Sequence, residues 1–358
     1  MVYDSGNYEP ALQKALDLIG YEEFVHEIQP RLHTEGRYVG IGVVAYVEGT
    51  GIGPYEGARV QVESSGRVTA VTGVGTQGQG HFTSFAQIVA DQLGVDVADV
   101  DVVTGDTDQF HWGAGTFASR GAVVAGNAFN EAARDVRAKV LKMATELLGA
   151  DEEVVELVGG TARVQNDPNR SVQLGKLAQA ANPLRGAVKP GTEPGLESTN
   201  YFGPERGSTA NGVHAMIIEV DPDTFLVDIQ RYVVVHDCGE VINPLILAGQ
   251  IQGGVAQGIG NAFYEKLMYD ETGQLLNASL MDYLIPTALD IPTIETDHVT
   301  TASPLNPMGI KGAGEAGAIP VGALFAQAIE DAIYDLDIEI TSIPLSPSVL
   351  WEIVEAAK

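Results

Sequence analysis

Cysteine is almost absent from this sequence, and a single thiol limits what the chain can hold by itself. Cys238 is the only cysteine among 358 residues. An internal disulfide is therefore impossible. An iron–sulfur cluster or a cysteine-rich zinc site held by this chain alone is excluded for the same reason.

Long apolar runs are also missing. No stretch approaches the length of a membrane-spanning helix, and the first residues lack a basic region followed by an apolar one. We therefore expect a cytoplasmic protein that has no membrane partner.

Positive charge is scarce. The chain carries 20 lysine and arginine residues against 48 acidic residues, which gives a formal net charge of −28, and lysine is the rarer of the two cations. Salt relieves the self-repulsion of so much negative charge. We interpret the composition as the acidic, hydrated surface of a halophilic protein, with an acidic protein from ordinary salt as the alternative. Either surface disfavours nucleic acid as a partner.

The remaining composition is that of a globular chain long enough for two or three lobes, with 45% hydrophobic residues. Helical and alternating patterns occur together and predict an α+β fold. We expect a helical lead-in over residues 1–36, a first lobe over 37–200 and a second lobe over 201–358. The proline- and glycine-rich stretch 183–212 is the predicted boundary between the lobes.

The chain is organised around a glycine-rich stretch near its C-terminal end. Residues 309–317 contain four glycines, and Glu315 stands between two of them. Pro320 then opens an apolar run that is typical of a helix. A glycine loop that leads into a helix start supplies free N–H groups suited to an anion. Taken alone, the loop is explained more simply as a tight turn with a solvated glutamate.

Two other glycine-rich turns also lead into predicted helices. The first, residues 73–81, contains Gln77 and Gln79, whose amides suit a ligand rich in ring nitrogens and carbonyls, and it matches neither a phosphate-binding loop nor a dinucleotide fingerprint. The second has Ser119 and Arg120 at its mouth. Both side chains suit a phosphate, although Arg120 is explained equally well as an ordinary surface arginine.

A third stretch, residues 246–265, has helical periodicity but contains five glycines. Each glycine costs a helix about 1 kcal/mol relative to alanine. Close packing against another helix or a ligand is the physical reason to expect for such a helix.

These stretches, together and in this order, resemble the molybdenum hydroxylases, the family of xanthine oxidase, aldehyde oxidoreductase and aerobic carbon monoxide dehydrogenase. The matching segments are residues 3–8, 75–81, 115–120, 236–244, 249–258 and 312–317. The resemblance covers the second half of the family's large, molybdenum-binding subunit. It implies a two-lobed molybdopterin-binding domain with mixed sheets flanked by helices, in which the matching segments converge on one cleft.

The resemblance also implies a cofactor and an activity. The cofactor is molybdopterin with molybdenum, in the cytosine dinucleotide form, and its own sulfur atoms rather than protein side chains hold the metal. The positions that match cofactor-binding residues are Gln77, Gly78, Gln79, Gly80, Ser119, Arg120, Gln257 and Gly314. Glu315 matches the catalytic base of oxidative hydroxylation, which inserts water-derived oxygen into an aldehyde, a heteroaromatic ring or carbon monoxide. A cofactor-binding or assembly module without turnover is the alternative.

Partners follow from the same resemblance. The half of the large subunit that precedes these motifs has no counterpart here, so the chain looks like one part of a split subunit or a truncated product. We expect it to associate with that N-terminal half, and with subunits that carry FAD and [2Fe–2S] clusters and remove the electrons. The family also implies a higher-order dimer of the complex and a small-molecule substrate.

Overall fold

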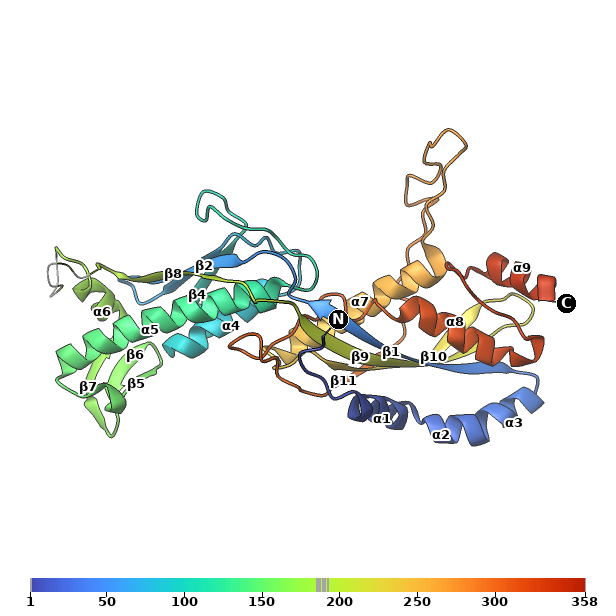
Figure 1. The fold of residues 1–358 in the computed structure, drawn as a ribbon, viewed down its shortest axis with the longest axis horizontal. Coiled ribbons are helices and arrows are strands. Elements are labelled where there is room, and N and C mark those ends of the chain that lie inside the picture. The colour runs from blue at the N-terminus through green and yellow to red at the C-terminus, as the bar shows by residue number, and fades with distance from the viewer. Residues whose placement is uncertain (1, 185–187, 189–190, 192, 358) are drawn as a thin grey trace.

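Two four-stranded mixed sheets form the frame of the molecule, which is elongated along the line that joins them (Figure 1). The computed structural model describes residues 2–184, 188, 191 and 193–357. The α+β prediction is confirmed. We call the two halves the long-strand lobe and the short-strand lobe, after the strands of their sheets.

The long-strand lobe has the strand order β1-β9-β10-β11, in which only the β10/β11 pair is parallel. Its strands are β1 (Tyr38–Thr50), β9 (Ser208–Val220), β10 (Val227–Asp237) and β11 (Ile294–His298). Strands β9 and β10 form an antiparallel hairpin.

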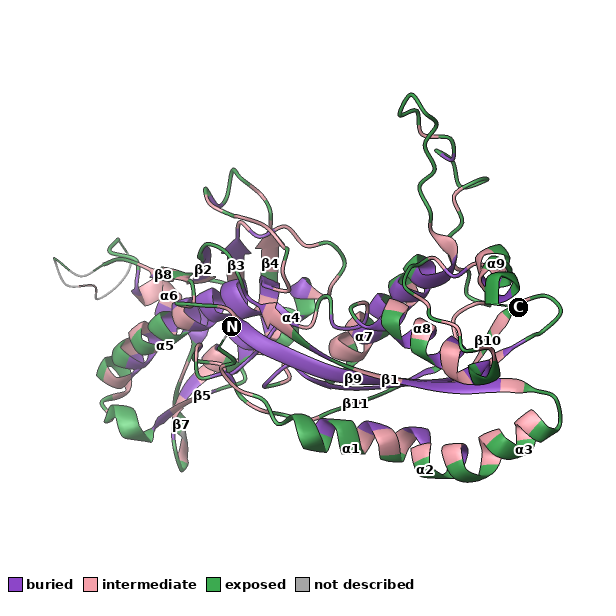
Figure 2. Ribbon diagram, turned by 45° about the vertical axis from the view of Figure 1, so that its right-hand side comes forward, coloured by how far each residue is buried: buried purple, intermediate pink, exposed green. Residues whose placement is uncertain are grey.

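Helices cover both faces of this sheet (Figures 1 and 2). One face carries α1 (Tyr8–Ile19), α2 (Tyr21–Glu23), a π-helical turn (Phe24–Ile28) and α3 (Gln29–Thr34). The other face carries α7 (Pro244–Ile259), its π-helical extension (Gly260–Tyr264) and α8 (Val321–Ala332). A short 3₁₀ turn (Tyr334–Leu336) and α9 (Pro347–Ala357) follow. Because both faces are covered, β9 is buried along nearly its whole length and reads as a continuous apolar run.

The short-strand lobe has the strand order β4-β3-β2-β8. Its strands are β2 (Glu56–Val62), β3 (Val68–Thr72), β4 (Val100–Thr104) and β8 (Leu196–Phe202), and β2 and β3 form an antiparallel hairpin. Two helices pack on this sheet and form its core, namely α4 (His81–Leu93) and α5 (Asn127–Leu148), which a π-helical segment (Gly121–Gly126) precedes.

The far end of the short-strand lobe carries a small three-stranded sheet and a helix. The elements are β5 (Val155–Val158), β6 (Thr161–Val164), β7 (Asp167–Gln173) and α6 (Leu174–Ala180), with 3₁₀ turns at Val97–Asp99 and Glu152–Val154. None of the helices in the described part of the chain combines the length and apolar character needed to cross a membrane.

Strand pairing divides the chain differently from the predicted lobe limits. Strand β1 pairs with β9 from Tyr38↔Val220 to Thr50↔Ser208, so it lies in the long-strand lobe. The chain therefore enters the short-strand lobe after Thr50 rather than at residue 37. The expected start of the first lobe is corrected accordingly, because a partner strand about 170 positions away in sequence outweighs the local pattern.

The glycines of α7 serve close packing between elements. A Cβ at Gly258 would lie 2.4 Å from a methyl of Val321, and one at Gly254 would lie 2.8 Å from Gly317. Conversely, a Cβ at Gly317 would lie 2.2 Å from the carbonyl oxygen of Ile251. The missing side chains thus let α7 pack directly on the glycine-rich stretch that carries Glu315.

Candidate functional site

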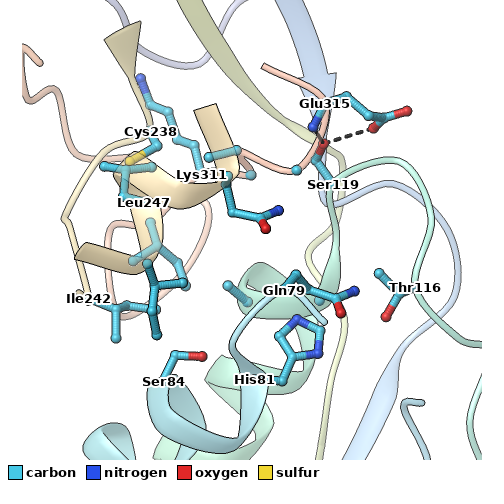
Figure 3. Close-up of a pocket in the computed structure, with 18 of the residues that line it drawn as sticks. Gln79, His81, Ser84, Thr116, Ser119, Cys238, Ile242, Leu247, Lys311 and Glu315 are labelled. Atoms are coloured by element: carbon cyan, nitrogen blue, oxygen red, sulfur yellow. Dashed lines mark hydrogen bonds between the residues drawn. The ribbon is translucent and has the colours of Figure 1, made fainter. Parts of the chain in front are cut away.

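A cavity of about 580 Å³ lies where the two lobes meet. The short-strand lobe contributes the start of α4 and the loop before the π-helical segment, whereas the long-strand lobe contributes α7, the loop before it and the glycine-rich stretch (Figures 1 and 3). Gln79, Gln257 and Glu315 all line this one cavity. The prediction that the cofactor stretches converge on one cleft is therefore confirmed for residues 75–81, 115–120, 249–258 and 312–317, whereas residues 3–8 do not line this cavity.

The glycine-rich stretch packs tightly against Ser119. A Cβ at Gly312 would lie 2.0 Å from the carbonyl oxygen of Ser119, and the Gly312 N–H donates to Thr50 Oγ1 at 2.9 Å. Ala118 and Ser119 both have positive φ angles, of 47° and 49°. Such angles are rare for residues with a side chain and concentrate at functional sites. They aim the Ser119 hydroxyl at Glu315 (Figure 3).

Glu315 is fixed at both ends by this serine. Its backbone N–H donates to Ser119 Oγ at 3.1 Å, and its carboxylate Oε2 lies 2.8 Å from the same Oγ, which donates to it. The Glu315 side chain is exposed at the edge of the cavity. It is therefore an oriented carboxylate that a bound molecule can reach, and not merely a solvated residue on a turn.

Glutamine amides supply much of the polar lining. The side chains of Gln77, Gln250 and Gln257 make no hydrogen bond to any part of the chain that the structure describes. Gln79 Oε1 accepts from the Gln77 backbone N–H and from Thr76 Oγ1, so its amide N–H₂ remains available. These groups provide donors and acceptors that suit a ligand rich in ring nitrogens and carbonyls.

The cavity wall also holds an unpaired imidazole nitrogen. His81 begins α4, its ring stacks on Phe85 at 4.6 Å, and its buried Nδ1 has no hydrogen-bond partner among the described residues. Burial lowers the pKa of His81 to about 4, so the ring is neutral near pH 7. The start of α4 adds free backbone N–H groups to this wall.

The one lysine among the lining residues is held by its neighbours. The Lys311 ammonium lies 3.3 Å from Asp237 Oδ2 and donates to Thr301 Oγ1 at 2.9 Å, and the Lys311 and Asp237 side chains are both fully buried. Lys311 therefore anchors the glycine-rich stretch to the end of β10. Because the Lys311 ammonium is bonded in this way, the groups that can bind a ligand in the cavity are mainly neutral amides, hydroxyls and backbone N–H groups.

Arg120 does not lie where a phosphate ligand would need it. Its side chain is fully buried, pairs with the equally buried Glu56, and donates to the carbonyl oxygens of Ile52, Pro54 and Gly115. It is not among the residues that line the cavity. The expected phosphate contact is corrected to a structural one: the guanidinium holds the loop that presents Ser119.

All but one of the other predicted positions line the cavity. Those that line the cavity are Gln77, Gly78, Gln79, Ser119, Gln257, Gly314 and Glu315. Gly80 does not line it but caps the start of α4 with a positive φ of 77°. The lining residues that sequence reasoning did not select are His81, Thr116, Asn243, Gln250 and Lys311 among others. Gln250 carried a usable signal, because it precedes Gln257 by two helical turns on one face of α7.

Another missed residue stands directly behind Ser119. Glu48, near the end of β1, places its Oε1 3.1 Å from Ser119 Oγ, while its Oε2 is buried without a partner. Burial, followed by the nearby charge of Glu315, raises the pKa of Glu48 to about 7. An isolated acid at the end of a strand gave no sequence signal.

Comparison with known proteins identifies the family. Residues 14–292 match the molybdopterin cofactor-binding domain family, and the chain belongs to it. The nicotine 6-hydroxylase large subunit of Paenarthrobacter nicotinovorans is 34% identical over 370 residues, which cover 100% of this chain and 45% of that protein. The family resemblance predicted from the motifs is thereby confirmed.

Solved structures agree with this assignment. Quinoline 2-oxidoreductase from Pseudomonas putida 86 superposes with a TM-score of 0.89 at 36% identity, covering 98% of this chain and 46% of that chain. Carbon monoxide dehydrogenase from Oligotropha carboxidovorans superposes with a TM-score of 0.90 at 34% identity, and the match covers 99% of this chain and 46% of that chain. The chain thus spans less than half the length of these relatives.

Proposed function

We propose that this chain is the cofactor-binding part of a molybdenum hydroxylase large subunit, with Glu315 as the general base. The observation that carries the proposal is the convergence of an oriented carboxylate and free glutamine amides on one cavity between the lobes. The substrate class is an aldehyde, a heteroaromatic ring or carbon monoxide, and the oxygen inserted comes from water.

The cavity fits molybdopterin in its cytosine dinucleotide form. The unpaired Nδ1 of His81 and the free amides of Gln77, Gln250 and Gln257 suit the pterin and the base, while N–H groups at the start of α4 suit the phosphates. When bound, the cofactor supplies the two-electron redox chemistry, and the protein supplies binding and orientation.

Glu315 is suited to removing a proton at the edge of this cavity. Ser119 fixes the direction of its carboxylate, and solvent exposure keeps a route open for the proton to leave. The absence of side chains at Gly312 and Gly314 lets the glycine-rich stretch lie directly against Ser119, because a Cβ would approach Ser119 atoms to 2.0 Å at Gly312 and to 3.3 Å at Gly314.

The test is molybdenum loading of the assembled large subunit. We expect about one molybdenum per complex by elemental mass spectrometry, and at least tenfold weaker retention in the Gln250→Leu/Gln257→Leu variant, because each removed amide leaves ligand polar groups unpaired at about 1–3 kcal/mol. Gln252→Leu is the matched control, since Gln252 is exposed on the same helix and does not line the cavity. Equal loading of all three proteins would contradict the assignment of the cavity.

We further infer that a complementary part of the large subunit covers an apolar arm, defined as residues 265–293. The arm projects from the end of α7 and is exposed along most of its length (Figures 1 and 2). Nine large apolar side chains on it are at least 44% exposed: Leu267, Met268, Tyr269, Leu276, Leu280, Met281, Leu284, Ile285 and Leu289. So large an apolar patch on a chain of charge −28 marks an interaction surface.

The arm has enough internal order to act as a preformed docking element. Tyr269 and Leu275 form a β-bridge, and the side chain of Asn277 accepts from the Met268 N–H at 2.9 Å and donates to the Lys266 carbonyl. More than half of the relatives' length has no counterpart in this chain, and that part is the occupant we assign to the arm. The [2Fe–2S] clusters belong to further subunits, since the single cysteine of this chain cannot hold a cluster, and we assign FAD to a further subunit as well.

Polar substitutions on the arm should weaken this association. In Leu280→Ser/Met281→Ser/Leu289→Ser, each change removes a buried apolar contact worth about 1 kcal/mol or more, so the Kd for the complementary part should rise on the order of 100-fold. Leu184→Ser is the control, because the Leu184 side chain is 95% exposed and lies in the other lobe. Titration calorimetry showing equal Kd values for both variants would remove the arm from the interface.

A further inference from the structure

The candidate base shares its serine with a second carboxyl group. Ser119 Oγ lies 2.8 Å from Glu315 Oε2 and 3.1 Å from Glu48 Oε1, and it also accepts the Glu315 N–H at 3.1 Å. A serine hydroxyl has a single hydrogen to donate. It can therefore satisfy one carboxylate oxygen, and the other glutamate must bring a hydrogen of its own.

Burial decides which glutamate carries that hydrogen. Glu48 is half-buried and its second oxygen is buried without a partner, whereas Glu315 is exposed. No ion pair joins Glu48 to a lysine or arginine within the described ranges. An unpaired charge costs far more in such a place than an unpaired carbonyl oxygen. Glu48 is thus the protonated member, and Glu315 is the charged one.

We propose that Glu48 is a positioning residue that donates a hydrogen to Ser119, so that the Ser119 hydroxyl points its own hydrogen at Glu315. The chain Glu48–Ser119–Glu315 then holds a single negative charge, located on the group nearest the ligand. The significance for catalysis rests on the proposed function, but the hydrogen-bonded chain is a property of the protein without any cofactor.

The surrounding groups are compatible with this arrangement. Glu48 is acted on by Glu315 from the glycine-rich stretch and by Ser119 from the loop of the other lobe. On its own strand, the buried hydroxyl of Tyr46 senses the charge of Glu48. The Glu48 carboxyl therefore titrates with a midpoint near pH 7 instead of the ordinary 4.5, through burial first and Glu315 second. Above that pH two charges compete for the hydrogen of one serine.

Carboxyl carbon NMR of the full chain, labelled with ¹³C-glutamate, tests the proposal without molybdenum or partners. We expect one resonance with a midpoint near pH 7 that is lost in Glu48→Gln and kept in Glu240→Gln, another cavity glutamate. In Glu315→Gln the midpoint should fall toward 4.5 without reaching it, because burial persists when the neighbouring charge is removed.

A second readout reports the coupling itself. The Glu315 resonance, assigned by its loss in Glu315→Gln, should change its chemical shift at the Glu48 midpoint, and Glu48→Gln should abolish that change. No resonance titrating near pH 7, or a Glu48 midpoint unmoved by Glu315→Gln, would overturn the proposal. Failure of the complex to load molybdenum would instead contradict the proposed function and leave these titrations unchanged.

Discussion

Glu315→Gln should lose about 10²–10⁴-fold in turnover in the assembled enzyme, the usual cost of removing a general base. Glutamine has the same shape and still accepts the hydrogen bond from Ser119, so the loop should keep its conformation. What it lacks is basicity. Molybdenum content should therefore stay at the wild-type level while steady-state turnover with an artificial electron acceptor falls.

The control for that measurement is Glu146→Gln, which removes one acidic charge from an exposed position on α5. It should leave both turnover and loading unchanged. Near-normal turnover of Glu315→Gln would show that Glu315 is not the base. Loss of cofactor from Glu315→Gln would instead give the residue a structural role, in agreement with the explanation of residues 309–317 as a tight glycine turn.

The largest effect on stability should come from Arg120→Met. Arg120 and Glu56 are both fully buried, and the substitution leaves the Glu56 carboxylate uncompensated among backbone groups. Breaking a buried pair from one side costs about 3–5 kcal/mol. The transition in urea, followed by circular dichroism, should shift to clearly lower denaturant.

Two comparisons make this stability test specific. Arg120→Met/Glu56→Leu should recover much of the loss, because no unpaired charge then remains. Arg37→Met breaks an ion pair with Glu219 that lies largely at the surface, and should cost less than about 1 kcal/mol. If Arg120→Met is as mild as Arg37→Met, the buried pair does not hold the loop that carries Ser119.

The sequence predicted the elements of the site better than their surroundings. Glycine turns that lead into helices have local signatures, and the structure brings the start of α4 and the Glu315 stretch to the same cavity. The five glycines of residues 246–265 also predicted close packing. Gly254 provides it against Gly317 of the Glu315 stretch, and Gly258 provides it against Val321 of α8.

Long-range partners explain what the sequence did not predict. The pairing of β1 with β9 and the burial of Arg120 against Glu56 both depend on residues far apart in the chain, which local pattern does not report. Glu48 was missed for the same reason, because its importance comes from Ser119 and Glu315. Ser119 lies 71 residues after Glu48, and Glu315 lies 196 residues after Ser119.

Anomalous diffraction at the molybdenum edge, from crystals of the assembled large subunit, tests most directly whether the cavity between the lobes holds the cofactor. We expect one strong peak in the cavity between the lobes, beside the carboxylate of Glu315 and next to Gln79 and Gln257. A peak outside this cavity, or a fully assembled large subunit purified from molybdenum-replete cells with no peak at all, would contradict it.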